Sequence, residues 1–195
     1  MSIVAVINHD LQYDMVKRNQ ERINALEDVK PAFHNFLNNI RELDHKVIHM
    51  QHINLPDDPK AERYEGGYLP VQKGTPGAEI IKEFLDSRDI VIEKNKDSAF
   101  FETNLHEVLQ ELGVDTVIVT GMHAQICVQT TAADSFIRGY NVWVPEDAIV
   151  SARKEDKDRA LTWLDGYCAT VSTCEEIVSL LKAGKDLPVK KVCTP

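Results

Sequence analysis

VIVTGMHAQICVQTTAAD, residues 117–134, is the stretch that decides how this chain folds. It begins as a short apolar run rich in β-branched residues, passes Gly121, and reaches Cys127 in what we expect to be the first turn of a helix. A thiol placed there meets unpaired backbone N–H groups and the positive end of the helix dipole, which favour the thiolate and can hold a developing oxyanion. The stretch therefore predicts a strand that delivers a candidate nucleophile to a helix.

Short apolar runs alternate with helical patterns on both sides of this stretch. The alternation predicts an α/β domain with a mainly parallel sheet of six strands. Pro31 predicts a break, or the start of a new helix, within the helical stretch expected over residues 19–44. The irregular segment 53–79, rich in glycine and proline, is expected to form a lid, a binding loop or an oligomer contact. We expect one domain over residues 1–195, with strands at 3–8, 47–51, 90–93, 116–120, 141–144 and 169–171.

The composition is that of an ordinary globular protein, with 43% hydrophobic and 27% charged residues. A net charge of −9, from 22 basic and 31 acidic residues, argues against a nucleic-acid-binding surface. No apolar run approaches membrane-spanning length, and the first residues resemble a strand and not a signal peptide. The four cysteines show neither a CxxC pair nor zinc-type spacing, so we expect reduced thiols and a cytoplasmic location. Cys168, Cys174 and Cys193 are interpreted as structural or incidental.

Three ionisable side chains fall just beyond predicted strands, where sites gather in parallel sheets. Asp10 follows the first strand, Lys94 the third and Cys127 the fourth. Right-handed crossovers place these strand ends on one edge of the sheet. An aspartate partly buried beside a lysine can accept the thiol proton, while the ammonium and the helix dipole stabilise the thiolate. The three residues suit acyl transfer, in which the thiolate attacks a carbonyl, an amine leaves, and water hydrolyses the thioester.

Several motifs follow one another along nearly the whole chain. They are DLQYD (10–14), KNKDSAF (94–100) with TNL (103–105), GMHAQICV (121–128) with TTAAD (130–134), RGY (138–140) and PEDA (145–148). In this order they resemble the isochorismatase-like cysteine hydrolases, the superfamily that contains nicotinamidase and N-carbamoylsarcosine amidase. The resemblance implies a three-layer α/β/α sandwich of Rossmann-like type, a catalytic triad of Asp10, Lys94 and Cys127, and a homo-oligomer, either a dimer or a tetramer. It also implies a cis peptide bond at Met122–His123 and an oxyanion hole formed by the N–H groups of His123 and Cys127.

A metal site is not expected. Nicotinamidases of the superfamily hold a metal with an Asp-x-His pair after the second strand, and here that pair reads His52-x-Asn54. His45, His49 and His52 surround the strand expected at 47–51 and would not all share one face of it. We therefore expect no metal and no cofactor. Three residues close to the triad in sequence could line a substrate pocket or simply pack in the core: Met15, Phe100 and Ile126.

The function that Cys127 favours is hydrolysis of a C–N bond in a small amide, carbamoyl or imide-like substrate. Asp10 would act as base and then acid, and Lys94 would stabilise the thiolate. Two alternatives stay open: an isochorismatase-type vinyl-ether hydrolase that uses Asp10 and Lys94 without the thiol, and a catalytically silent binding or scaffold protein on the same fold. Taken singly, each residue has an ordinary interpretation, such as a small buried hydrophobe for Cys127, but their joint occurrence favours catalysis. We expect a small-molecule substrate as partner, and neither nucleic acid nor membrane.

Overall fold

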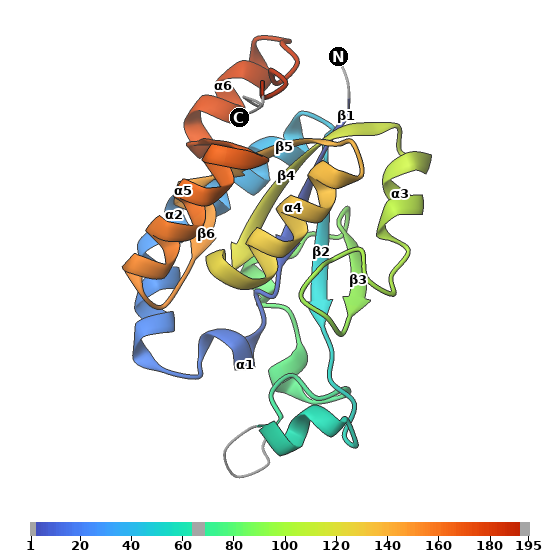
Figure 1. Ribbon diagram of the computed structural model, residues 1–195, viewed down its shortest axis with the longest axis vertical. Coiled ribbons are helices and arrows are strands. Elements are labelled where there is room, and N and C mark those ends of the chain that lie inside the picture. The colour runs from blue at the N-terminus through green and yellow to red at the C-terminus, as the bar shows by residue number, and fades with distance from the viewer. Residues whose placement is uncertain (1–2, 64–68, 192–195) are drawn as a thin grey trace.

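The computed structural model describes residues 3–63 and 69–191, so Cys193 lies outside the described residues. Within them, one parallel sheet with seven strands forms the centre of the molecule (Figure 1). The strand order is β3–β2–β1–β4–β5–β7, and β6 pairs with β4. The strands are β1 (Ile3–His9), β2 (Lys46–His52), β3 (Ile90–Lys94), β4 (Val114–Met122), β5 (Asn141–Pro145), β6 (Ile149–Val150) and β7 (Thr170–Ser172).

The predicted α/β class and mainly parallel sheet are confirmed, with one strand more than the six expected. The additional strand, β6, has only two residues and pairs with Gly121 and Met122 at the end of β4. It follows β5 after a single 3-10 turn, η6 (Glu146–Ala148). So short a strand leaves no separate apolar run in the sequence, which is why the pattern missed it.

Helices cover both faces of the sheet (Figure 1). They are α1 (Tyr13–Val16), α2 (Gln20–Glu42), α3 (Leu105–Glu111), α4 (Gln129–Ile137), α5 (Lys154–Tyr167) and α6 (Cys174–Lys182). Alternate residues of β1 enter two apolar cores: Ala5 and Ile7 pack with α3, α4 and α5, whereas Val4 and Val6 pack with α2 and α6. This alternation is the period of two expected for a strand that is buried on both faces. The three-layer α/β/α arrangement follows from it.

Helix α2 runs through Pro31 without interruption, so the break expected there is wrong. Pro31 is exposed, while Phe33, Phe36, Leu37 and Ile40 are buried against the sheet. A proline inside a helix removes one backbone hydrogen bond. Here the packing of a long apolar face outweighs that local cost. The periodicity of the sequence does not show how strongly such packing stabilises the helix.

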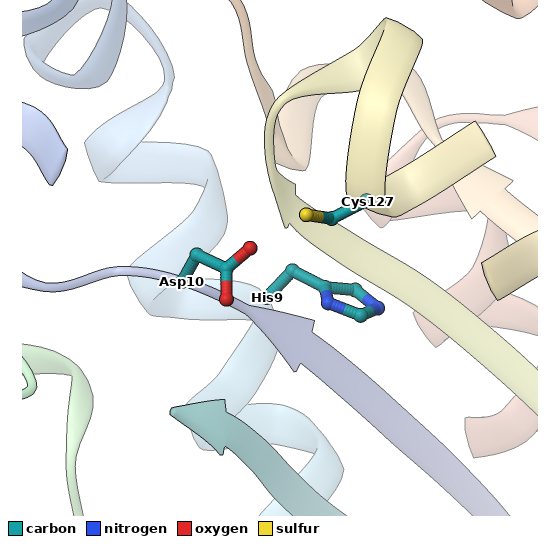
Figure 2. A group of neighbouring side chains, drawn as sticks. All are labelled: His9, Asp10 and Cys127. Atoms are coloured by element: carbon teal, nitrogen blue, oxygen red, sulfur yellow. The ribbon is translucent and has the colours of Figure 1, made fainter. Parts of the chain in front are cut away.

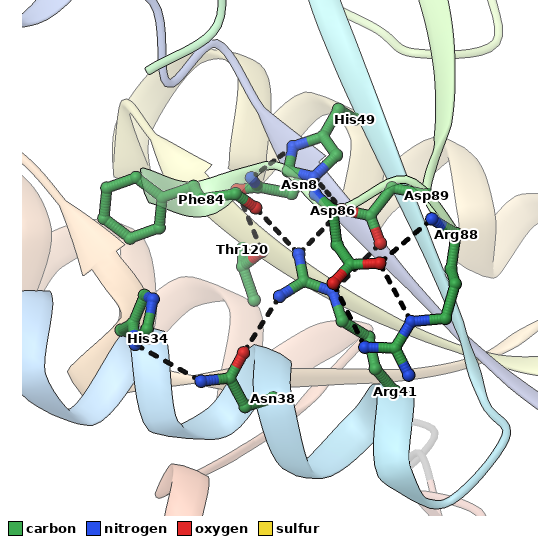
Figure 3. Close-up of polar contacts among 10 residues, drawn as sticks. All are labelled: Asn8, His34, Asn38, Arg41, His49, Phe84, Asp86, Arg88, Asp89 and Thr120. Atoms are coloured by element: carbon green, nitrogen blue, oxygen red, sulfur yellow. Dashed lines mark hydrogen bonds and ion pairs between the residues drawn. The ribbon is translucent and has the colours of Figure 1, made fainter. Parts of the chain in front are cut away.

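A buried polar row crosses three neighbouring strands of the sheet (Figure 3). His49 of β2, Asn8 of β1 and Thr120 of β4 are neighbours in register. The distance from Asn8 Nδ2 to His49 Nδ1 is 2.9 Å, and Thr120 Oγ1 donates to Asn8 Oδ1 at 3.3 Å. His49 Nε2 lies 2.9 Å from Asp89 Oδ2, which also binds Arg41 of α2 at 2.7 Å. The row therefore ties α2 to the strands that carry the site described below.

The irregular segment 53–79 is described except for residues 64–68. Its described parts contain two 3-10 turns, η1 (Pro59–Arg63) and η3 (Pro76–Ala78), and a third turn, η4 (Lys82–Phe84), follows it. Among the described helices, none is both long enough and apolar enough to cross a bilayer.

Candidate active site

The three residues singled out from the sequence lie where the connections of the sheet change direction. The chain passes from β1 to β2 and β3 on one side, and later to β4 and β5 on the other, so β1 and β4 are neighbours. Open α/β sheets bind ligands beyond the strand ends at such a point. Asp10 follows β1 with a φ of 56°, Lys94 is the last residue of β3, and Cys127 lies in the π-helical turn η5 (Ala124–Val128) after β4. The topology therefore brings the three side chains to one edge.

The ammonium nitrogen of Lys94 is the centre of this cluster. Lys94 Nζ lies 3.1 Å from Asp10 Oδ1 and 3.2 Å from Asp10 Oδ2, and it donates to Cys127 Sγ at 3.4 Å. It also donates to Lys96 O at 3.0 Å and lies 3.5 Å from His52 Nδ1. Asp10, Lys94 and Cys127 are all buried. One ammonium thus bridges a carboxylate and a thiol away from bulk water.

Burial and the neighbouring charges set the protonation of the cluster. Burial raises the pKa of the Cys127 thiol well above its ordinary value, the charge of Asp10 raises it further, and Lys94 lowers it only in part. Burial alone would raise the pKa of Asp10, but the charge of Lys94 brings it below the ordinary value. Burial likewise opposes the charge of Lys94, yet Asp10 and Cys127 raise the pKa of the ammonium. These shifts favour a carboxylate on Asp10, an ammonium on Lys94 and a neutral thiol on Cys127 in the free site.

The backbone at the end of β4 passes unusually close to β1. The peptide bond between Met122 and His123 is cis, at the position that the resemblance implied. Gly121 has a φ of 97°, and a Cβ atom added there would lie 2.2 Å from His9 O. Only glycine combines this left-handed conformation with so close an approach of two chains. Gly121 thus lets β4 carry the turn with Cys127 up to the end of β1.

Turn η5 presents the backbone N–H groups of the expected oxyanion hole. His123 precedes the turn as its N-cap residue, and Cys127 is the fourth residue within it. His123 O accepts hydrogen bonds from Ile126 N at 3.1 Å and Val128 N at 3.3 Å, which closes the turn. Helix α4 continues directly from it. The two expected donors therefore come from the residue directly before the turn and from the fourth residue within it.

Two further side chains support the cluster and were not singled out from the sequence, although each lies in a quoted motif. Gln12 is buried, and its Nε2 donates to His52 O at 2.8 Å and to Ala78 O at 2.7 Å, while its Oε1 accepts from His52 N at 2.8 Å. It therefore fastens the end of β2 and the irregular segment to β1. Asp97 Oδ1 lies 4.0 Å from Cys127 Sγ and adds a negative charge that also raises the pKa of the thiol.

The three residues suggested as pocket lining have different surroundings. Phe100 is buried in the core and stacks on Tyr140, with ring centroids 6.1 Å apart, so it packs in the core. Met15 is partly buried and packs against the apolar cores. Ile126 is 40% exposed and lines a cavity of about 420 Å³ together with His123 and Arg22. Of the three, Ile126 is the one that belongs to turn η5, directly before Cys127.

Each of the three histidines in and around β2 contacts a different partner. His45 Nδ1 accepts a hydrogen bond from Val4 N at 3.3 Å, and His49 belongs to the polar row. His52 Nε2 lies 3.3 Å from Asn54 Oδ1, so the pair found where nicotinamidases carry Asp-x-His consists of two neutral side chains bonded to one another. Such a pair supplies no anionic ligand, so it does not fit a metal site of the kind that nicotinamidases form with their Asp-x-His pair.

His9, the last residue of β1, is a feature that the sequence analysis did not single out. Its side chain is 0% exposed, and neither ring nitrogen has a hydrogen-bond partner within the described residues. Burial, and then the charge of Lys94, lower the pKa of His9 to about 3, so the ring is neutral. Figure 2 shows it beside Asp10 and Cys127, whose carboxylate and sulfur face one another. Only its place next to Asp10 in the sequence could have drawn attention to it.

Comparison with known proteins gives one consistent family. The isochorismatase domain model matches residues 4–176. The chain is 42% identical over 91 residues to the uncharacterized isochorismatase family protein YaaI of Bacillus subtilis. The aligned region covers 46% of this chain and 50% of that protein. It is 36% identical over 107 residues to nicotinamidase 3 of Arabidopsis thaliana, covering 53% of this chain and 54% of that protein. The chain thus spans about half the length of these two curated relatives.

A solved structure extends the likeness to nearly the full chain. The crystal structure of N-carbamoylsarcosine amidase from Thermoplasma acidophilum superposes with a TM-score of 0.76 and 30% identity, covering 89% of this chain and 97% of that one.

Proposed function

This chain belongs to the isochorismatase family of hydrolases, and we propose that it cleaves a C–N bond in a small amide, carbamoyl or imide-like substrate through a thioester on Cys127. The observation that carries the proposal is the position of Lys94 Nζ, 3.1 Å from Asp10 Oδ1 and 3.4 Å from Cys127 Sγ. A base, a cation and a nucleophile in mutual reach are the parts that covalent acyl transfer requires. The likeness to N-carbamoylsarcosine amidase supports the same class of bond.

The proposed reaction begins with transfer of the Cys127 proton to Asp10 as the sulfur attacks the substrate carbonyl. Because the thiol is neutral in the free site, deprotonation accompanies attack and does not precede it. The N–H groups of His123 and Cys127 would hold the oxyanion of the tetrahedral intermediate, each worth about 3 kcal/mol of barrier. Lys94 offsets the negative charge that the carboxylate and the sulfur share during this step.

The second half of the proposed reaction uses the same groups in reverse roles. Protonated Asp10 gives its proton to the leaving nitrogen, and the C–N bond breaks to leave an acyl group on Cys127. Asp10, again a carboxylate, takes a proton from a water molecule that attacks the thioester. The S–C bond breaks, the sulfur recovers a proton from Asp10, and the acid product leaves.

A panel of small amides, carbamoyl compounds and cyclic imides, monitored for ammonia or amine release, tests this proposal. Cys127→Ala should abolish release on any substrate that the wild type turns over, whereas Cys174→Ser, which changes a buried thiol in α6, should retain it. Retention of full turnover by Cys127→Ala would contradict the proposal.

A second candidate is hydrolysis of a vinyl ether without the thiol, as the name of the matching domain model suggests. The raised pKa of Cys127 favours this candidate too, because a neutral thiol beside Asp10 can be a bystander. The two reactions respond differently to thiol-blocking reagents. Alkylation of Cys127 should stop amide hydrolysis and leave acid-catalysed vinyl-ether hydrolysis intact. A protein that shows neither reaction and no labelling of Cys127 by electrophilic amide analogues would be a binding or scaffold protein.

We further propose that the protein acts in the cytoplasm as a homo-oligomer, a dimer or a tetramer. The free, buried thiols of Cys127, Cys168 and Cys174 suit a reducing compartment. Light scattering during size-exclusion chromatography gives the oligomer number directly, and a monomeric mass at micromolar concentration would contradict this part of the proposal.

A further inference from the structure

Among the residues that the structure describes, none forms a hydrogen bond with the buried ring of His9. A buried polar group without a hydrogen bond costs roughly 1–3 kcal/mol, so such groups call for a physical reason. A neutral imidazole ring has one nitrogen with a free lone pair, which is the form in which histidine binds metals. It lies at the end of β1, directly before Asp10, and its backbone is held against Gly121 of β4. The position is therefore fixed by the sheet.

Three different ligand types meet at this place. A ring nitrogen of His9, a carboxylate oxygen of Asp10 and the sulfur of Cys127 all lie within 4.8 Å of one another, and all three residues are buried (Figure 2). Tetrahedral zinc holds N, O and S ligands at about 2.0–2.3 Å, which separates the ligand atoms by roughly 3.5 Å. The three groups need to close by about one ångström to surround a cation. This closure is small for side chains at the ends of two adjacent strands and a turn.

We propose that His9, Asp10 and Cys127 form a binding site for a thiophilic divalent cation such as Zn²⁺, and that the cation blocks the nucleophile. On binding, the S–H bond of Cys127 breaks, its proton passes to the solvent, and Zn–S, Zn–N and Zn–O bonds form. A water molecule completes the four ligands, and no electron is transferred. The binding does not depend on the proposed function, but the block of turnover does.

The ammonium of Lys94 lowers the affinity of this site for a cation. Its ammonium holds the same carboxylate and the same sulfur, so the cation must displace it. The ammonium keeps its bond to Lys96 O at 3.0 Å and can withdraw toward it. The repulsion between the two cations makes the site weaker than a structural zinc site. Removal of the ammonium should consequently tighten metal binding while it destroys turnover, a combination that adventitious binding elsewhere on the surface does not give.

Titration of the purified protein with Co²⁺, followed by absorption, tests the proposal without any assay of activity. A cobalt–thiolate bond gives a charge-transfer band in the near ultraviolet, and Zn²⁺ should remove that band by competition. The band should be absent in Cys127→Ser and present in Cys174→Ser, which alters a thiol outside the site. His9→Phe, which keeps the ring size and removes both nitrogens, should weaken Co²⁺ binding about 100-fold. Lys94→Met should strengthen it.

The second test is inhibition of the wild type by Zn²⁺, measured with a substrate found in the amide screen. The zinc concentration for half inhibition should rise about 100-fold in His9→Phe. His9→Gln serves if His9→Phe fails to fold, as judged by circular dichroism. Equal Co²⁺ affinity of wild type and both His9 variants would overturn the site, and activation by Zn²⁺ would overturn the block. A cobalt–thiolate band with no amide turnover in any assay would leave the site standing and overturn the proposed function instead.

Discussion

The ammonium nitrogen of Lys94 lies 3.4 Å from the sulfur of Cys127 and donates to it, although Lys94 ends β3 and Cys127 lies in turn η5 after β4. This contact does not by itself make the thiol acidic. The same ammonium is paired with Asp10, whose negative charge raises the pKa of Cys127, and burial raises it more. The pair of Lys94 and Asp10 is close to neutral, so it does not offset the effect of burial on the pKa of the thiol.

Asp10→Asn separates the reactivity of the thiol from catalysis. Loss of the carboxylate charge leaves Lys94 alone with Cys127, so the pKa of the thiol should fall and alkylation of Cys127 by iodoacetamide at pH 7.5 should become faster. Amide turnover should fall by about 10³-fold or more, because the base is gone. Peptide mapping of the alkylated cysteine gives the rate. Slower alkylation in Asp10→Asn would show that Asp10 activates the thiol in the free protein.

Gly121 should not tolerate a side chain. Gly121→Ala places a Cβ 2.2 Å from His9 O on a backbone with a φ of 97°, so β4 and β1 must separate at the site. We expect a loss of roughly 2 kcal/mol or more in the free energy of urea unfolding.

Gly166→Ala is the matched control. Gly166 lies within α5, and a Cβ there meets nothing within 4 Å. This change should stabilise the protein by about 0.5–1 kcal/mol, because alanine favours a helix over glycine. Equal effects of the two substitutions would refute the close approach of β1 and β4.

The ion pair between Arg41 and Asp89 should be costly to break from one side. Arg41→Met leaves the buried Asp89 carboxylate without its cation, which should cost about 3–5 kcal/mol in the free energy of unfolding. The exposed pair of Arg88 and Asp86 provides the control, and Arg88→Met should leave the unfolding curve unchanged within error. The double variant Arg41→Met/Asp89→Leu should recover part of the loss. Indistinguishable unfolding curves for Arg41→Met and Arg88→Met would refute a buried pair.

Stability should fall below about pH 6.5 because of His123. Burial, and then the charge of Arg22, lower the pKa of His123 from 6.5 to about 4. Between pH 6.5 and pH 4 the unfolded chain therefore binds a proton at this histidine that the folded chain does not bind. The contribution of His123 to the free energy of unfolding is fully present above pH 6.5 and is lost as the pH falls through that window. At pH 5.0 this amounts to about 2 kcal/mol. His123→Gln should reduce the difference in unfolding free energy between pH 7.5 and pH 5.0 by that amount, and an unchanged difference would refute the lowered pKa.

The sequence predicted the part of the site that rests on topology. Asp10, Lys94 and Cys127 each follow an apolar run, and a parallel sheet brings such ends together whatever the details of packing. Features of the site and the fold that depend on how deeply a residue is buried could not be predicted from the sequence in this way. The neutral state of Cys127 results from the surroundings of the sulfur, and the continuity of α2 through Pro31 results from the apolar face beneath it. That the ring of His9 has no hydrogen-bond partner in the described part of the chain can be seen only in the structure.

The most direct test is the intact mass of the protein quenched with acid during turnover of a substrate from the amide screen. The proposed mechanism predicts an added acyl mass, located by peptide mapping at Cys127, which disappears on treatment with hydroxylamine and is absent from Cys127→Ala. Continued turnover by Cys127→Ala, with no acyl mass on the wild type under the same rapid quench, would contradict a thioester on Cys127.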